Sequence, residues 1–154
     1  MDLRRININL NGSPTPPLAD DSEEIVELEN KMGFRLPSEY IGFLKTHDGG
    51  HPEIGSIILG EEDPANIFDV DWFYSASNPA IKNLSEAIDE WKPVLGDGAL
   101  PFGQDAGGNQ FYLNLSDKAP AVWLLLHDQE GKKIKIADNF STFISMLQEN
   151  PDFI

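Results

Sequence analysis

Residues 36–50 constrain the fold of this chain more than any other segment of its sequence. Pro37 suits the first turn of a helix, where the N–H that proline lacks would have no partner within the helix. Apolar and aromatic side chains then recur at the spacing of one helix face, as Tyr40, Phe43, Leu44 and His47. Gly49 and Gly50 follow and are expected to stop the helix. The segment therefore predicts an amphipathic helix that starts at Pro37, buries one face and ends at a double glycine.

Three further helices are predicted from capping residues and from the spacing of apolar side chains. Proline cannot donate a backbone hydrogen bond, so we place a proline beyond the end of a helix rather than inside it. The expected starts and ends, in chain order, are Asp20 or Asp21 to Gly33, Asn78-Pro79 to Pro93, and Asp138 or Asn139 to Pro151.

Strands are predicted where apolar, β-branched and aromatic residues run between turn residues. The expected strands are residues 3–10, 56–59, 67–73, 110–115, 122–127 and 133–136. Helices and strands do not alternate strictly, so we predict an α+β fold rather than a parallel doubly wound sheet. We expect a mostly antiparallel sheet of about four to six strands with about four helices packed around it. Residues 1–18 are expected to form an arm with a proline-rich loop, and residues 19–154 a single domain.

A second glycine-rich segment, residues 101–111, precedes one of the predicted strands. It lacks the Lys-Ser/Thr pair of a phosphate-binding P-loop, and the segment after it is predicted as a strand rather than a helix. We therefore interpret it as a turn that leads into a strand.

The charge of the chain is strongly negative and unevenly distributed. The 154 residues carry a formal net charge of −15, yet no lysine or arginine lies between Thr46 and Ile81. Seven acidic residues lie in that same stretch: Asp48, Glu53, Glu61, Glu62, Asp63, Asp69 and Asp71. A surface of one sign projects a field that attracts a basic partner and repels nucleic acid and anionic membranes. Trp72 and Tyr74 lie beside these acids and are typical anchors of protein interfaces, although each could instead fill the core.

The sequence predicts a cytoplasmic protein without a membrane segment. It contains no cysteine, and no apolar run approaches the ~20 residues needed to span a bilayer. The start of the chain lacks the pattern of a signal peptide. The strong negative charge favours a monomer, because like-charged copies repel one another.

No sequence motif predicts a metal, a cofactor or a catalytic residue. His47 and His51 are four residues apart, a spacing that can hold a metal on a helix, but Gly49 and Gly50 interrupt the helix between them. The pair Asp69-x-Asp71 lacks the rest of a calcium loop, and no G-x-S-x-G turn is present. If residues 67–73 form one strand, both carboxylates lie on the same face. A hydrolase that uses carboxylates, or His47 and His51, would require these groups to converge in a pocket.

Taken in order, these motifs resemble the SUKH superfamily. The matching parts are Leu36-Pro37 to Gly49-Gly50, and then residues 103–115, 122–128 and 138–147. The resemblance covers residues 23–148 and leaves the N-terminal arm outside. It implies a SUKH-like fold and a protein that binds other proteins. The family includes bacterial immunity proteins that neutralise toxins, and fungal cell-wall regulators of the Smi-Knr type.

Two hypotheses of function follow from the resemblance and the charge pattern. In the first, the chain is an immunity-type protein that is not an enzyme. It would neutralise a cognate toxin with a basic surface, a nuclease being one candidate, by docking the acidic stretch on it. The expected contact residues are Asp48, Glu53, Glu61, Glu62, Asp63, Asp69, Asp71, Trp72 and Tyr74. In the second, the same scaffold is a regulatory domain that binds a cell-envelope or signalling protein.

Overall fold

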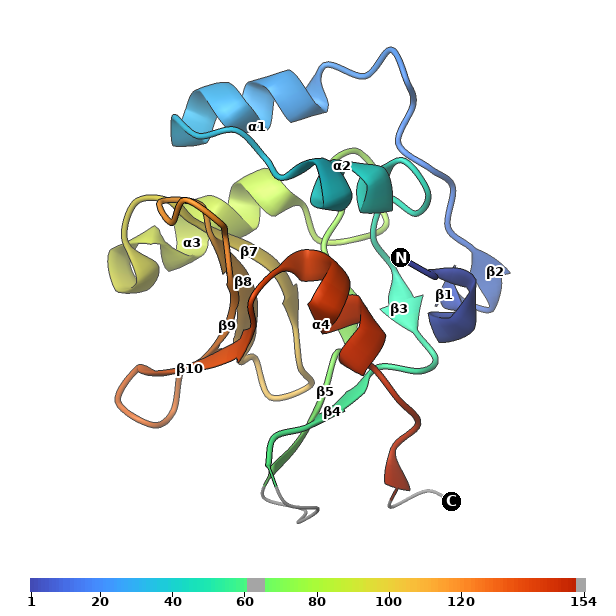
Figure 1. Cartoon of the computed structure of the whole chain (residues 1–154). Coiled ribbons are helices and arrows are strands. Elements are labelled where there is room, and N and C mark those ends of the chain that lie inside the picture. Colours follow the sequence, from blue (N-terminus) through green and yellow to red (C-terminus); the bar gives the residue numbers. More distant parts are fainter. Residues whose placement is uncertain (61–65, 152–154) are drawn as a thin grey trace.

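The computed structural model describes residues 1–60 and 66–151 of the chain. Within these residues it contains four α-helices and ten strands, and the strands form three antiparallel sheets (Figure 1). The predicted α+β class is confirmed. The number of strands is higher than expected because two small sheets accompany the main one.

The main sheet has five strands in the order β10-β9-β8-β7-β6. Every pair of neighbours is antiparallel. The strands are β6 (Trp72–Phe73), β7 (Ala99–Gln104), β8 (Gln110–Asn114), β9 (Val122–Leu126) and β10 (Lys132–Ala137). The strand β7 was not predicted, although it lies inside the sheet.

An aromatic core fills the space between this sheet and the helices α2 (Ser38–Leu44) and α4 (Phe140–Met146). Phe102 of β7 lies at its centre, with ring centroids 5.3 Å from both Phe140 and Phe143. The predicted inner face of α2 is confirmed for Tyr40, Phe43 and Leu44, which are all fully buried. The fourth predicted member, His47, is half-buried and lies beyond the end of the helix. A smaller cluster on the other sheet face includes Tyr112, Leu125 and side chains of α3 (Leu84–Leu95).

The predicted helix ends are correct in some places and wrong in others. α1 (Glu24–Met32) ends at Gly33 in the left-handed conformation, as predicted, but its first residue follows Glu23 and not Asp20 or Asp21. α2 begins one residue after Pro37, which occupies the capping position. The Asn139 cap of α4 is confirmed, because its side chain accepts a hydrogen bond from the Thr142 amide at 2.8 Å.

The predicted start of α3 at Asn78-Pro79 is wrong. Asn83 is the residue that caps this helix, and its side chain accepts hydrogen bonds from the amides of Ser85 and Glu86. Asn78 instead closes a turn by accepting from the Ala80 amide at 3.0 Å. Pro93 also lies inside α3 rather than beyond its end.

The double glycine does not stop α2, which already ends at Leu44. It allows the chain to pass tightly between β6 and the N-terminal arm. A Cβ atom on Gly49 would lie 2.8 Å from the carbonyl oxygens of both Phe73 and Tyr74. A Cβ atom on Gly50 would lie 2.8 Å from a methyl group of Ile8. Neither position has room for a side chain.

The N-terminal arm belongs to the same core as the rest of the chain. After a short 3₁₀ helix (Arg4–Ile6), β1 (Ile8–Leu10) pairs with β2 (Ser13–Pro14) on one side and β3 (His51–Pro52) on the other. Four side chains of the arm join the main core: Leu3, Ile6, Ile8 and Leu18. The Arg5 guanidinium also donates to the carbonyl oxygens of Ile144 and Leu147 at the end of α4.

The third sheet is a two-stranded hairpin of β4 (Ser56–Ile58) and β5 (Ile67–Asp69). The prediction of one strand over residues 67–73 is wrong, because the chain leaves the hairpin at Val70-Asp71 and enters the main sheet as β6. Asp69 and Asp71 therefore do not share the face of a single strand. The hairpin extends away from the main sheet, and the segment after α4 runs beside it (Figure 1).

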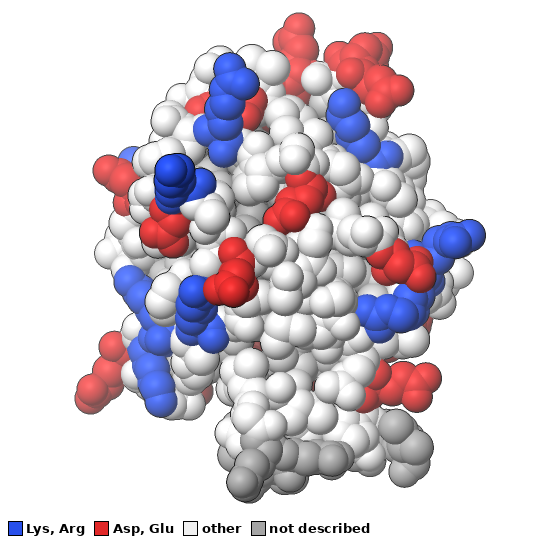
Figure 2. Space-filling model, in the orientation of Figure 1, with Lys and Arg blue, Asp and Glu red and all other residues white. Residues whose placement is uncertain are grey.

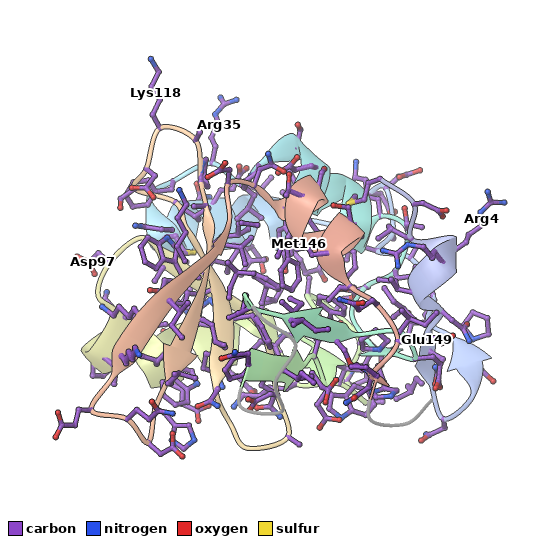
Figure 3. All side chains as sticks on the ribbon, turned by 60° about the horizontal axis from the view of Figure 1, so that its bottom comes forward. Arg4, Arg35, Asp97, Lys118, Met146 and Glu149 are labelled. Atoms are coloured by element: carbon purple, nitrogen blue, oxygen red, sulfur yellow. The ribbon has the colours of Figure 1, made fainter. Side chains whose placement is uncertain are left out.

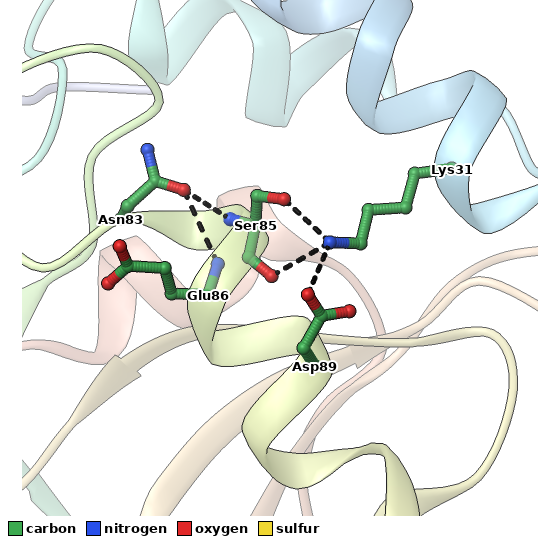
Figure 4. A network of polar contacts seen from close by, with 5 residues as sticks. All are labelled: Lys31, Asn83, Ser85, Glu86 and Asp89. Carbon is green, nitrogen blue, oxygen red and sulfur yellow. Dashed lines mark hydrogen bonds and ion pairs between the residues drawn. The ribbon is translucent and has the colours of Figure 1, made fainter.

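Helix α1 buries little of its surface, and one lysine links it to α3. Leu28 is its only buried side chain, and Val26 is 57% exposed. The Lys31 ammonium bonds to the Ser85 hydroxyl at 2.7 Å and to the Asp89 carboxylate at 2.8 Å, which joins α1 to the first turns of α3 (Figure 4).

Lys31→Met is expected to loosen α1 selectively. The substitution keeps the apolar stem but removes the ammonium, and a partly exposed ion pair of this kind contributes ~1 kcal/mol or less. We expect amide hydrogen exchange in α1 to accelerate, with little change in the main sheet. Lys118→Met, in the exposed β8–β9 turn, is the matched control. Unchanged exchange in α1 would contradict the role given to Lys31.

Candidate partner-binding surface

An open hollow of about 280 Å³ lies where the β4–β5 hairpin joins the body of the protein. Three of the predicted contact residues, Glu53, Asp69 and Asp71, lie around it, which brings together acids from two separate segments of the chain. The other lining residues are His51, Pro52, Gly55, Ser56, Val70, Ala106 and Asn150.

Neutral donors orient two of these carboxylates. The buried Asn9 side chain donates to Glu53 at 2.8 Å. The Ser56 hydroxyl and the Asn150 amide both donate to Asp69, the latter at 3.1 Å to Oδ2. Because the donors carry no charge, these bonds fix the carboxylates in place without cancelling their negative charge.

Asp71 is held beside an aromatic pair. The Nδ1 atom of His51 lies 2.6 Å from the Asp71 carbonyl oxygen, which can only accept, so Nδ1 carries a proton. The same atom lies 3.8 Å from the Asp71 carboxylate. The ring of Trp72 is 5.8 Å from the His51 ring and remains partly exposed. Trp72 is thus placed as a candidate anchor next to the acids.

Lysine and arginine are absent from the segments that form most of this hollow. None occurs between Thr46 and Ile81. Across the described residues, neither Glu53 nor Asp69 forms an ion pair, and Asp71 has only His51. Figure 2 shows the blue side chains over the upper part and the two sides of the molecule and none over β4 and β5 on this face. In Figure 3, Arg4, Arg35 and Lys118 project at the periphery of the molecule.

Asp48 was predicted as a contact residue, and the structure corrects this prediction. It is 2% exposed, and its carboxylate accepts from the amide of Ala76 at 2.7 Å and from the amide and hydroxyl of Ser77 at 3.1 and 2.6 Å. These bonds hold the segment between β6 and α3 against the end of α2. Asp48 therefore shapes the fold and offers no charge to a partner.

Tyr74 is corrected in the same way. It is completely buried, and its hydroxyl donates to the side-chain oxygen of Gln110 at 2.5 Å. Burial raises the pKa of Tyr74 well above its ordinary value. The residue is a core side chain with a satisfied hydroxyl, so it cannot anchor a partner. The remaining predicted contacts, Glu61, Glu62 and Asp63, lie outside the described residues.

The two histidines considered for chemistry do not converge. His47 Nδ1 lies 3.2 Å from the Thr15 carbonyl oxygen, whereas His51 faces Asp71 in the hollow. In the part of the chain that the structure describes, no group of three or more His, Cys, Asp or Glu side chains is arranged to hold a metal ion.

Two residues reach the hollow from distant parts of the chain and were not predicted from the sequence: Ala106 and Asn150. Ala106 comes from a tight turn in which the Asp105 carboxylate accepts from the amides of Gly107 and Asn109, at 3.0 and 2.8 Å. Asn150 lies at the hollow because the segment after α4 pairs with β4, with Gln148 opposite Ser56. These contacts join residues far apart in the chain, and no local pattern signals them.

Comparison with known proteins establishes the family. A sequence model of the SMI1 / KNR4 family (SUKH-1) matches residues 21–146, so the chain belongs to this family, as the motifs predicted. It is also similar to the SPbeta prophage-derived uncharacterized protein YokK of Bacillus subtilis (strain 168). The two are 25% identical over 154 residues, which cover 88% of this chain and 78% of the relative. Among the helices of residues 1–60 and 66–151, none combines the length and apolarity that crossing a bilayer requires.

Proposed function

We propose that this chain is an immunity-type protein that neutralises a cognate bacterial toxin by docking its acidic hollow on a basic surface of that toxin. One observation carries the proposal: Glu53, Asp69 and Asp71 gather around one hollow, held by neutral donors and by His51. In residues 1–60 and 66–151, none of the three has a lysine or arginine as partner. Such a surface speeds association with a basic partner and disfavours acidic ones. Family membership supports a role in binding other proteins.

The mechanism we propose is occlusion. The acidic hollow covers basic residues of the toxin, while Trp72 provides apolar contact beside the charges. The protein then needs no catalytic residue, cofactor or metal of its own. It acts in the cytoplasm as a monomer, and its negative charge keeps it from nucleic acid and anionic membranes.

Capture from a lysate of the source cells tests this proposal. The tagged protein is expected to retain a basic protein at low salt and to lose most of it at high salt, because screening weakens contacts between exposed charges. The captured protein is then expressed in a bacterial host with and without this chain. We expect it to arrest growth alone and not in the presence of this chain. Capture of a harmless envelope or signalling protein would favour the regulatory hypothesis instead.

A variant with a neutralised hollow sharpens the test. Glu53→Gln, Asp69→Asn and Asp71→Asn together keep the shape of the side chains but remove three charges, so protection of the host is expected to fail. The control variant combines Asp20→Asn, Glu86→Gln and Asp128→Asn, which removes as much charge from exposed positions elsewhere. Protection should survive in the control. Equal protection by both variants would count against the hollow.

A further inference from the structure

The two edges of the β4–β5 hairpin differ in their pairing. On the outer side of β4, the Ser56 amide donates to the Gln148 carbonyl at 3.0 Å, and the Gln148 amide donates back at 2.9 Å. The segment after α4 thus covers this edge. Within the described residues, no strand pairs with the outer side of β5.

The register of the hairpin shows which groups that open edge presents. Ile57 lies opposite Phe68. On one side of this pair the Leu59 amide donates to the Asn66 carbonyl oxygen, and on the other side the Val70 amide donates to the Gly55 carbonyl oxygen. In an antiparallel ladder, alternate residues turn their N–H and C=O groups toward the partner strand. The backbone groups of Ile67 and Asp69 therefore point away from β4, toward the open side.

The side chains at this edge include no lysine to discourage strand pairing. Exposed edges are commonly guarded by lysines, as on β10, which carries Lys132, Lys133 and Lys135 at the border of the main sheet. β5 instead has the partly exposed Ile67 and Phe68 and a single charge, Asp69. Its edge is short, apolar and negative.

We propose that the free edge of β5 accepts an extended basic segment of the partner as an added strand. The inference rests on the proposed function and specifies how the partner binds. Backbone hydrogen bonds to Ile67 and Asp69 extend the hairpin by one strand, a recurring mode of peptide recognition. Alternate side chains of the added strand fall on the face of Asp69, next to the hollow, where lysine or arginine meets Glu53 and Asp71. A second copy of this chain is disfavoured at the same edge, because both copies carry a net charge of −15.

Two synthetic peptides of equal charge separate strand addition from attraction by charge alone. One alternates lysine and valine over about eight residues, enough for an ordinary strand. The other replaces each valine by proline, which removes half of the amide donors and disfavours a strand. Strand addition predicts that the lysine–valine peptide binds at least ~10-fold more tightly. It also predicts that the Ile67 and Asp69 amides become protected from hydrogen exchange in the complex.

Variants of the protein provide the second arm of this experiment. Ile67→Pro removes an outward N–H and should abolish the preference between the peptides, whereas Ile67→Val should keep it. Because Ile67→Pro could disturb the hairpin, the protection of the Asp69 amide in the unaltered protein is measured as well. Equal binding of both peptides, without protection at Ile67 and Asp69, overturns strand addition while leaving acidic docking intact. Strand addition by a partner is also overturned if neither peptide binds. It is overturned as well if the protein forms a dimer that protects the Ile67 and Asp69 amides. Capture of a toxin from the lysate tests the proposed function independently of this experiment.

Discussion

Gly49→Ala is expected to destabilise the protein by about 3 kcal/mol, a large effect for the addition of one methyl group. The new Cβ would lie 2.8 Å from the carbonyl oxygens of Phe73 and Tyr74, so β6 or the chain after α2 must move. Gly49 also has a φ of +80°, a conformation that alanine adopts only with strain. The close approach involves backbone atoms on both sides, and a side-chain rotation cannot relieve it.

The matched control for this prediction is Gly42→Ala. Gly42 lies inside α2, where an added Cβ would meet nothing within 4 Å. Alanine is a better helix former than glycine, so this variant should gain up to ~1 kcal/mol. Denaturant unfolding of both variants checks the pair. Similar stabilities for the two would show that β6 does not pass as close to Gly49 as the structure indicates.

Asp48→Ala is expected to cost about 3 kcal/mol of unfolding free energy, because it leaves donors of Ala76 and Ser77 without their acceptor in a buried place. The carboxylate receives three hydrogen bonds from these two residues. Asp69→Ala removes an exposed carboxylate and leaves one buried donor, the Ser56 hydroxyl, without this acceptor, so we expect a smaller cost of about 1 kcal/mol.

When the rate of association with the partner is measured, the order of the two effects should reverse, so that Asp69→Ala has the larger one. Folded Asp48→Ala protein is expected to associate with the partner at a nearly unchanged rate, whereas Asp69→Ala should associate more slowly. Thermal unfolding and association kinetics on the same samples test whether Asp48→Ala mainly lowers stability and Asp69→Ala mainly slows association. A stable Asp48→Ala variant with impaired binding would restore Asp48 as a contact residue and contradict its structural role.

Local patterns predicted the parts of the fold whose contacts lie close along the chain. The inner face of α2, the strands β8 to β10 and the Asn139 cap of α4 were all predicted correctly. In these segments the spacing of apolar residues and the capping residues point to the same structure.

β7 was missed because two of its residues normally interrupt strands. The register of β7 against β8 shifts between Pro101 and Gly103, which accommodates the proline. Gly103 has no room for a side chain, since a Cβ atom would lie 2.8 Å from the Trp72 carbonyl oxygen. Both features depend on neighbouring strands, so the sequence of the segment itself argues against the structure it forms.

The start of α3 was misplaced for a different reason. Asn78 and Asn83 both have the chemistry of a helix cap. Only Asn83 has its side-chain oxygen at the amides of Ser85 and Glu86. A sequence contains both candidates, and the packing of the segment between β6 and α3 decides between them.

The candidate site was predictable as a charge pattern and not as a geometry. The stretch without lysine or arginine drew attention to Glu53, Asp69 and Asp71, which the structure places around one hollow. It could not show that Asp48 turns inward, because burial depends on the distant Ala76 and Ser77. Nor could it show that Asn9 and Asn150 orient the carboxylates of the hollow.

The rate of association with the captured toxin tests the central claim most directly. The variant that lacks the charges of Glu53, Asp69 and Asp71 is compared with the control variant, which lacks those of Asp20, Glu86 and Asp128. At low salt we expect the first to associate about 10-fold more slowly than the unaltered protein and the second to change by less than about 2-fold. At high salt the three rates should converge. Equal rates for the two variants at low salt would contradict docking through the acidic hollow.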